Sequence, residues 1–491
     1  MSSLHRLVVI IVAVCALGGC DGSRRGGSGA ALKLERCRLE GVAAQARCGT
    51  WEVWEDREAK SGRRLSLHVA VLPALAARPA PDPLFILAGG PGQSASSVAR
   101  VLAPALERIR RKRDIVFVDQ RGTGESAPLH CELEPAKASL NERLRAELDE
   151  EAVRRCVAEL SKSHDLRHYG TNVAMDDLDE VRAALGYERI NLWGGSYGTR
   201  AGLVYLRKHP ERVRSAILDG VAPMALVLPK DVAADADRAL KLLFENCESS
   251  GPCREAWPRL GARFEALLTK LGETPARVEA PHPVTGEPER VEITREAFTR
   301  ILRALLYQPE ATSLVPLTID RASKGDFRPF LAQSELVSSG FSKDLAVGMF
   351  LSVVCTEDAP FLDEREVRKA AEGTFVGATF AVDIIRSCAL WPRGSIPEGF
   401  REPVVSDKPV LLLSGELDPV TPPRWGEEAA RHLPNSKHLV LPATGHGTLG
   451  SACVRRTMEK FLEEGTVAGL TEKCDEVTRP PFFVNFAGPP P

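Results

Sequence analysis

Short apolar runs that end in glycine or polar residues recur along the chain. They are rich in Val, Ile and Leu, and segments with helical spacing separate them. Such runs are typical of parallel strands covered by helices on both faces. The six runs begin near Pro83, Asp114, Arg189, Val213, Pro409 and His438. Two further strands, which alternate apolar and polar residues, are predicted between Thr50 and Ala74.

The stretch 225–397 has a different pattern. It contains amphipathic helical segments and lacks the strongly apolar runs found on either side of it. Because strands are predicted before and after it, we interpret it as a helical cap inserted into one α/β domain with a mostly parallel central sheet. The predicted core is therefore in two parts, 37–224 and 398–478, followed by a proline-rich tail at 479–491.

The N-terminus has the pattern of an export signal. Arg6 precedes an apolar run from Leu7 to Leu17, which is short for a membrane-spanning helix but suits a signal peptide over 1–19. "LGGC", ending at Cys20, resembles a bacterial lipobox, which implies that Cys20 carries a lipid. An ordinary signal peptide with a chance cysteine is the alternative. Residues 20–36 are rich in glycine and serine and are predicted to be a flexible tether.

Export changes how the 12 cysteines are interpreted. Cys15 leaves with the signal and Cys20 takes the lipid, so an even number remains in an oxidising compartment, where disulfides form. Sequence alone does not fix the pairing, but the cysteines fall into local couples. The expected disulfides are Cys37–Cys48, Cys131–Cys156, Cys247–Cys253, Cys355–Cys388 and Cys453–Cys474. The sequence contains no Cys-x-x-Cys pair, the spacing typical of zinc sites, and no metal or cofactor is expected.

The composition is that of an ordinary globular protein. Of 491 residues, 44% are hydrophobic and 26% are charged, and the formal net charge is −2. This balance gives no reason to expect a nucleic-acid partner, because such proteins usually carry a basic face.

The first candidate for chemistry is "GGSYGT", in which Ser196 lies between Gly194 and Gly198. This fits G-x-S-x-G, the turn that holds a nucleophilic serine between a strand and a helix. A predicted strand precedes it and a predicted helix follows it, as the motif requires. The alternative is a simple glycine-rich turn.

A serine hydroxyl needs a base to take its proton. In folds of this kind the partners follow in the order serine, acid, histidine. His446 and Asp418 satisfy this order on loops after the last two predicted strands, with Asp418 orienting the imidazole. The competing residues are the acids Glu416 and Asp407 and the histidines His209, His432 and His438.

Acyl transfer also needs donors for the developing oxyanion. The backbone N–H of Tyr197, directly after the serine, is expected to be one of them. The glycine cluster "AGGPG" follows an early strand, and Gly90 is the first choice for the second donor, with Gly89 the next.

These motifs together carry a family resemblance. "GGPGQS", "DQRGTGES", "GGSYGT", "GELDPVTPP" and "GHGT" resemble the α/β-hydrolase fold proteins of the proline iminopeptidase and tripeptidyl aminopeptidase group, from Ala88 to Cys474. The segment from Cys388 to Cys474 is similar to the family's tripeptidyl-aminopeptidase-like C-terminal region. Ala88 replaces the histidine of "HGGPG" and Tyr197 replaces a tryptophan, and both departures favour the tripeptidyl branch.

The resemblance implies an exported serine exopeptidase that releases residues or short peptides from substrates with a free N-terminus. Such an enzyme must bind an α-ammonium, for which carboxylates are natural partners. Glu357 and Asp358, beside Cys355, are the candidates. The alternatives are a carboxylesterase or lipase-like hydrolase with the same triad, and a non-catalytic envelope lipoprotein. The lipid at Cys20 would attach the protein to a bacterial membrane on its periplasmic side.

Overall fold

The computed structural model describes residues 31–131, 138–145, 149–283, 285–341, 345–471 and 473–484. The predicted signal peptide, the lipid site at Cys20 and most of the predicted tether lie outside these residues. No helix in the described ranges is long and apolar enough to cross a membrane.

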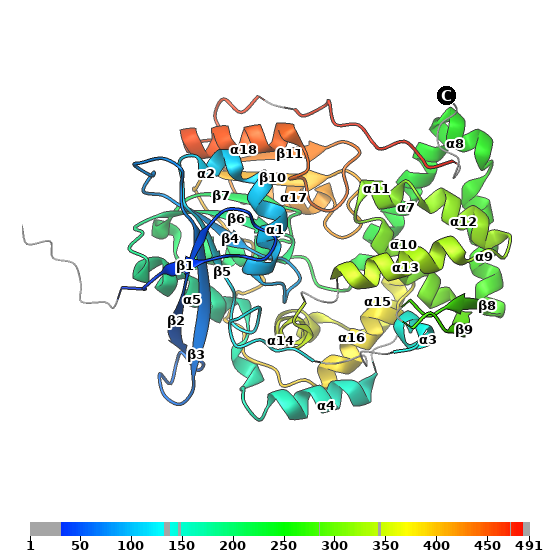
Figure 1. The fold of residues 1–491 in the computed structure, drawn as a ribbon, viewed down its shortest axis with the longest axis horizontal. Helices are drawn as coiled ribbons and strands as arrows, with labels where there is room; N and C mark the ends of the chain where they lie inside the picture. Colours follow the sequence, from blue (N-terminus) through cyan, green and yellow to red (C-terminus); the bar gives the residue numbers. More distant parts are fainter. Residues whose placement is uncertain are drawn as a thin grey trace, which may run out of the picture.

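A nine-stranded sheet forms the centre of the fold (Figure 1). Its spatial order is β1-β2-β3-β5-β4-β6-β7-β10-β11. The pairs from β1 to β5 are antiparallel, and every pair from β5 to β11 is parallel. The strands are β1 (Glu35–Cys37), β2 (Ala46–Trp54), β3 (Arg64–Leu72), β4 (Leu84–Leu87), β5 (Ile115–Val118), β6 (Ile190–Gly195), β7 (Val213–Asp219), β10 (Val410–Gly415) and β11 (Ser436–Leu441). The predicted α/β class with a mostly parallel sheet is confirmed.

The tether is shorter than predicted. β1 already begins at Glu35, and the side chains of Leu32 and Leu34 pack against the core. Apolar side chains in the sequence "ALKLE" therefore continue the fold N-terminal to the predicted boundary.

Burial on both faces explains the continuous apolar runs. In β4, Phe85 and Leu87 join one hydrophobic cluster, while Leu84 and Ile86 join the cluster on the opposite face. Successive side chains of a strand point to opposite faces, so a strand covered on both faces must be apolar throughout. The covering helices are α1 (Ala95–Ala105), α2 (Glu107–Arg110), α5 (Thr171–Ala184), α6 (Tyr197–Lys208), α17 (Pro423–Ala430) and α18 (Ala452–Glu464).

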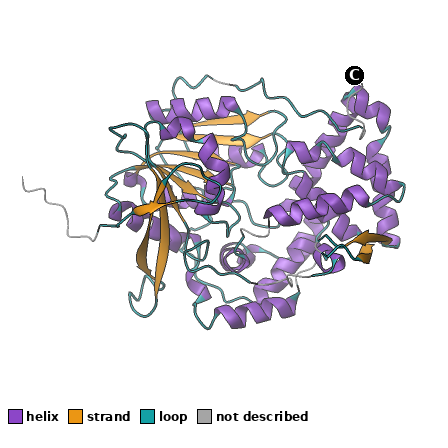
Figure 2. Ribbon diagram, in the orientation of Figure 1, coloured by secondary structure: helices purple, strands orange, loops and turns teal. Residues whose placement is uncertain are grey.

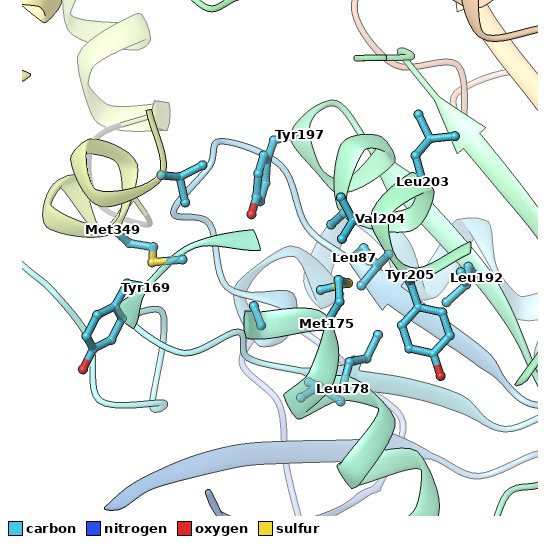
Figure 3. Close-up of a cluster of buried hydrophobic side chains, with 14 of the residues drawn as sticks. Leu87, Tyr169, Met175, Leu178, Leu192, Tyr197, Leu203, Val204, Tyr205 and Met349 are labelled. Carbon is cyan, nitrogen blue, oxygen red and sulfur yellow. The ribbon is translucent and has the colours of Figure 1, made fainter. Parts of the chain in front are cut away.

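Helix α6 packs deeply into this core. Figure 3 shows its Val204 near Leu87 of β4, with Met175 and Leu178 of α5 beside them. This packing fixes the helix that begins directly after Ser196.

The predicted insertion is helical and lies beside the sheet, on the right in Figure 2. It comprises α7 (Val232–Ser249), α8 (Gly251–Ala256), α9 (Leu260–Glu273), α10 (Arg295–Leu305), α11 (Pro309–Thr312), α12 (Val315–Ser323), α13 (Arg328–Phe341), α14 (Val347–Glu357), α15 (Glu364–Ala371) and α16 (Thr379–Leu390). A hairpin of β8 (Ala276–Pro281) and β9 (Pro288–Ile293), absent from the sequence prediction, interrupts the helices. Much of the region has its own hydrophobic cluster, in which Phe298 and Phe330 stack at 5.0 Å between ring centroids.

Two features depart from a simple cap. First, α3 (Leu140–Leu144) and α4 (Glu150–Leu160) precede Ser196 in sequence but contact β9 and α16 of the insertion. Second, α14 and α16 contribute buried side chains to the same cluster as the sheet. The helical layer therefore includes a segment from the first part of the chain and is joined firmly to the core.

The structure forms the five predicted disulfides. They are Cys37–Cys48, Cys131–Cys156, Cys247–Cys253, Cys355–Cys388 and Cys453–Cys474. The proline-rich tail, as far as Val484, has no helix or strand, and Phe482 packs against the helical cluster.

Candidate active site

Ser196 occupies the sharp turn between β6 and α6. Its backbone has φ 55° and ψ −123°, a conformation that side-chain-bearing residues rarely adopt. Three hydrogen bonds hold the turn. The Ser196 N–H donates to the carbonyl of Asp219 (2.9 Å), and the Ser196 carbonyl accepts from the N–H (2.9 Å) and the hydroxyl (2.6 Å) of Thr199. The predicted strand–serine–helix arrangement is therefore present.

Both glycines of the G-x-S-x-G motif are required because any side chain at either position would clash with neighbouring backbone. A Cβ at Gly194 would lie 2.3 Å from the carbonyl oxygen of Gly198, and a Cβ at Gly198 would lie 2.0 Å from that of Leu87. These contacts are with backbone atoms, which cannot rotate away. The turn thus brings β4, β6 and α6 together with no room for a methyl group.

Asp418 and His446 form a hydrogen-bonded pair on the loops after β10 and β11. His446 Nδ1 lies 2.8 Å from Asp418 Oδ2. The carboxylate is fully buried, whereas 15% of the histidine side chain is exposed. The backbone N–H groups of Val420 and Thr421 donate to Asp418 Oδ1, both at 2.8 Å, and so orient the carboxylate.

Each member of this pair shifts the pKa of the other. Burial tends to lower the pKa of His446, but the neighbouring Asp418 carboxylate outweighs burial, so the pKa is raised above 6.5. Burial tends to raise the pKa of Asp418, but the charge and hydrogen bond of His446 outweigh it, so this pKa is lowered. The pair is therefore arranged for a charged carboxylate beside an imidazole of increased basicity.

The competing residues have contacts with groups other than Ser196 and His446 in the described part of the chain. Glu416 accepts from the N–H of Ala443, while the side chains of His209, His432 and His438 lie near Asp176, Glu428 and Ser414, respectively. Asp407 accepts, through its backbone carbonyl, from the side chain of Asn435. Asp418 has the hydrogen bond to His446 that an orienting acid requires.

Ser196 and His446 line one cavity of about 1050 Å³. The loops after the strands form one side of it, and α10, α14 and α16 contribute Arg303, Phe350 and Phe380 to the other. The wall is largely apolar, as is usual for sites that bind organic ligands. In the described part of the chain, no three or more His, Cys, Asp or Glu side chains are grouped to hold a metal.

The predicted oxyanion loop passes against the serine. Gly89 and Gly90 both line the cavity, and a Cβ at Gly89 would lie 3.3 Å from the Cβ of Ser196. Gly90 has φ 107°, which glycine adopts readily. Tyr197 begins α6, so its backbone N–H is among those that a helix leaves unpaired.

Glu357 and Asp358 do not have the predicted role. Neither lines the cavity, and both are buried. Glu357 accepts from the N–H (2.6 Å) and hydroxyl (2.9 Å) of Thr171, while Asp358 pairs with Arg200 (2.9 Å) and Arg401 (3.1 Å). Burying a carboxylate costs free energy unless it has hydrogen-bond or charged partners, and these partners offset that cost for Glu357 and Asp358. The prediction that these acids bind substrate is therefore wrong.

Two residues near the histidine were missed in the sequence. Both Asp219 oxygens accept from the N–H of Thr448, at 3.1 and 3.0 Å, and burial raises the pKa of Asp219 to about 6. Tyr307, from the insertion, accepts from the N–H of His446 through its carbonyl (2.7 Å) and packs its ring against the imidazole. Asp219 follows a predicted buried strand, which could have signalled a site residue, whereas no pattern marked Tyr307.

The topology and the nucleophile-type turn define an α/β-hydrolase. The family model described as "alpha/beta hydrolase fold" matches residues 82–246, and the model described as "TAP-like protein" matches residues 373–474. The chain therefore has the α/β-hydrolase fold and carries a TAP-like C-terminal region. The resemblance expected from the motifs is confirmed. The TAP-like match begins at residue 373, whereas the start of this region predicted from the sequence is Cys388.

The chain is similar to named relatives over most of its length. It is 27% identical to "Serine protease Hip1" of Mycobacterium tuberculosis, covering 88% of each chain. It is also 27% identical to "Carboxylesterase B" of the same organism, covering 87% of this chain and 86% of that one. A "Tripeptidyl aminopeptidase" of Streptomyces coelicolor is 35% identical over 146 residues, which are 27% of each chain.

A solved structure of proline iminopeptidase from Mycobacterium smegmatis is also similar. It shares 17% identity and a TM-score of 0.39, and the match covers 85% of this chain and 98% of that chain.

Proposed function

We propose that this chain is an exported serine exopeptidase that releases N-terminal residues or short peptides. The observation that carries the proposal is the buried Asp418–His446 pair, which opens onto the same cavity as Ser196. The similarity to a serine protease over 88% of the chain favours a peptide bond as the target. The disulfides favour a protein that folds in an oxidising compartment.

In the proposed mechanism, the Ser196 hydroxyl oxygen attacks the scissile carbonyl carbon while His446 Nε2 accepts its proton. The backbone N–H groups of Tyr197 and Gly90 stabilise the oxyanion. His446 then donates the proton to the leaving nitrogen, and the C–N bond breaks. A water molecule, deprotonated by His446, hydrolyses the acyl-enzyme and restores Ser196.

Asp418 has a positioning role in this scheme. Its carboxylate keeps the proton of neutral His446 on Nδ1, so Nε2 is free to act as base. It also stabilises the imidazolium that forms during attack, which agrees with the raised pKa of His446.

Because Glu357 and Asp358 do not line the cavity, other carboxylates must bind the α-ammonium group of a substrate with a free N-terminus. The acids that line the cavity are Glu142, Asp149 and Asp219. Asp219 is buried beneath the histidine loop, whereas Glu142 and Asp149 are exposed at α3 and α4. These two are the carboxylates that we propose for the ammonium group.

A carboxylesterase is the second candidate, because the relative named "Carboxylesterase B" matches with the same identity and nearly the same coverage. Fold alone does not separate ester from peptide hydrolysis.

We propose export with a lipid on Cys20, which metabolic labelling with a fatty-acid probe would test against a Cys20→Ala variant.

The deciding experiment compares tripeptidyl and aminoacyl anilides with acyl esters, each with a free or a blocked amine. We expect turnover of free-amine anilides and its loss in Ser196→Ala, whose melting temperature should match that of the wild type. Hydrolysis of blocked esters alone would support the esterase, and an active Ser196→Ala variant would overturn the mechanism.

A further inference from the structure

The helical wall of the cavity carries positive charge. Arg300 and Arg303 lie three residues apart on α10, on one face of the helix, and both line the cavity. Arg300 donates to the carbonyl of Arg143 at 3.1 Å. Arg303, by contrast, forms no ion pair with a carboxylate among the residues that the structure describes.

Aromatic rings fix the position of Arg303. Its guanidinium carbon lies 5.8 Å from the ring centroid of Tyr307 and 5.4 Å from that of Phe380. One of its nitrogens donates to the Tyr307 hydroxyl at 3.3 Å. A guanidinium held in this way keeps further N–H groups in a planar fork, which suits a carboxylate with two oxygens.

The carboxylates of the cavity do not neutralise this group. Glu142 accepts from the backbone and hydroxyl of Ser139, Asp149 accepts from the N–H of Glu151, and Asp219 accepts from Thr448. All three are therefore engaged with groups other than Arg303. The positive charge of Arg303 remains available to an anionic part of the substrate.

The location of Arg303 indicates which anionic part of the substrate it contacts. Tyr307 contacts both groups: its ring centroid lies 5.2 Å from that of the His446 imidazole and 5.8 Å from the guanidinium carbon of Arg303. The general acid must reach the leaving nitrogen, so the leaving fragment extends on the His446 side of the scissile bond. Extended peptides span roughly 3.3–3.6 Å per residue, so these two contacts limit the separation of Arg303 from the imidazole to about three residues at most.

We infer that Arg303 is a specificity-determining residue that binds a carboxylate of the leaving fragment. The preferred substrates are then short peptides whose C-terminus, or an acidic side chain, lies one to three residues beyond the scissile bond. This inference rests on the proposed peptidase function and extends it to the leaving side of the substrate.

The test uses three peptides with a free N-terminus. They are pentaalanine as the free acid, pentaalanine as the C-terminal amide, and the amide with aspartate as its last residue. Loss of each peptide is followed by chromatography and mass spectrometry to obtain kcat/KM. We expect the free acid to be cleaved about tenfold to a hundredfold faster than the plain amide, as for a hydrogen bond to a charged group.

Variants separate recognition from a structural effect. Arg303→Met should slow cleavage of the free acid much more than cleavage of the plain amide and so remove the preference, and Arg303→Lys should retain part of it. Arg155→Met is the matched control, because Arg155 also lines the cavity but lies 3.4 Å from its partner Glu151. Its preference should equal that of the wild type.

The outcomes are distinct. Faster cleavage of the aspartate-containing amide than of the plain amide would show that a side-chain carboxylate suffices, and the free acid alone being fast would identify the C-terminus. Equal cleavage of all three peptides, or an equal loss on all three in Arg303→Met, would overturn the inference while leaving the peptidase function intact. Hydrolysis of esters with no cleavage of any peptide would overturn the proposed function, and the inference with it.

Discussion

The backbone at Ser196 is strained. Its φ of 55° and ψ of −123° lie in a region that glycine alone adopts freely. The surrounding contacts leave no alternative, because β4 and α6 approach too closely for any other turn. The strain places the hydroxyl at the cavity, and its cost is tolerated because a well-packed core holds the turn.

Relief of this strain should be measurable. Ser196→Gly should raise the free energy of unfolding by about 1 kcal/mol, since the relief of strain exceeds the extra chain entropy of glycine. Thermal unfolding monitored by circular dichroism would show a higher melting temperature than for Ser196→Ala, which keeps the Cβ. A glycine variant less stable than the alanine variant would contradict this account. Both variants should be inactive.

In the proposed mechanism, the coupling of Asp418 to His446 sets the pH dependence of activity. His446 must be neutral to accept a proton, and its pKa is raised above 6.5. Activity should therefore rise with pH along a limb that lies above 6.5. Asp418→Asn removes the charge that raises this pKa, so the limb should move to lower pH while kcat falls by roughly three to four orders of magnitude.

The profile of kcat/KM against pH tests this expectation. Glu416→Gln is the matched control, because Glu416 lies two residues away and accepts from the N–H of Ala443 rather than from His446. Its limb should coincide with that of the wild type. An acid limb that stays in place in Asp418→Asn would show that another group controls the base.

At the scale of elements, the loop that carries His446 is shared between the core and the insertion. The His446 N–H donates to the Tyr307 carbonyl at 2.7 Å, and Thr448 donates to Asp219 at the end of β7. The connection between α10 and α11 thus supports the proposed base from one side, and the sheet supports it from the other.

Crowding this contact should displace the base. A Cβ at Gly445 would lie 2.3 Å from the Tyr307 carbonyl oxygen. Gly445→Ala must therefore move backbone, and we expect kcat to fall about a hundredfold, as for a displacement of about 1 Å at a reacting group. Steady-state kinetics on an anilide would measure this. Gly450→Ala, where a Cβ meets nothing within 4 Å, should behave as the wild type; equal effects of the two substitutions would contradict the role of Tyr307.

The elements that were predictable share one property. Strands such as β4 and β10 are buried on both faces, so their apolar runs are continuous and local sequence identifies them. Ser196, Asp418 and His446 follow such strands, and their order along the chain was informative. Partners of Glu357 were not predictable, because Thr171 lies 186 residues away and no local pattern records that contact.

At the scale of the whole molecule, two regions with different cores are joined at the cavity. Helices α7–α13 pack mainly within their own cluster, whereas α14 and α16 belong to the cluster of the sheet. The disulfide Cys355–Cys388 links α14 to α16, and Phe350 and Phe380 of these helices line the cavity. This disulfide therefore supports the cavity wall as well as the fold.

The two disulfides of the insertion should differ in effect. Removing Cys355–Cys388, with a sequence separation of 33 residues, should cost about 4 kcal/mol of unfolding free energy, and removing Cys247–Cys253, with a separation of 6, should cost about 2 kcal/mol. Urea unfolding of the two double-alanine variants measures this difference. Only the first should also lower kcat/KM, and equal losses of activity in both would contradict its support of the cavity.

The carbonyl of Tyr307 has a consequence for how this enzyme can be re-engineered or can diverge. An insertion that reaches only the substrate could be exchanged between relatives as a module, with catalysis left intact. Here the insertion also supplies a backbone oxygen to the loop of His446, the proposed general base. A chimera that takes its insertion from another enzyme must place a carbonyl oxygen where that of Tyr307 lies. Otherwise its specificity will change and the proposed base will also be displaced.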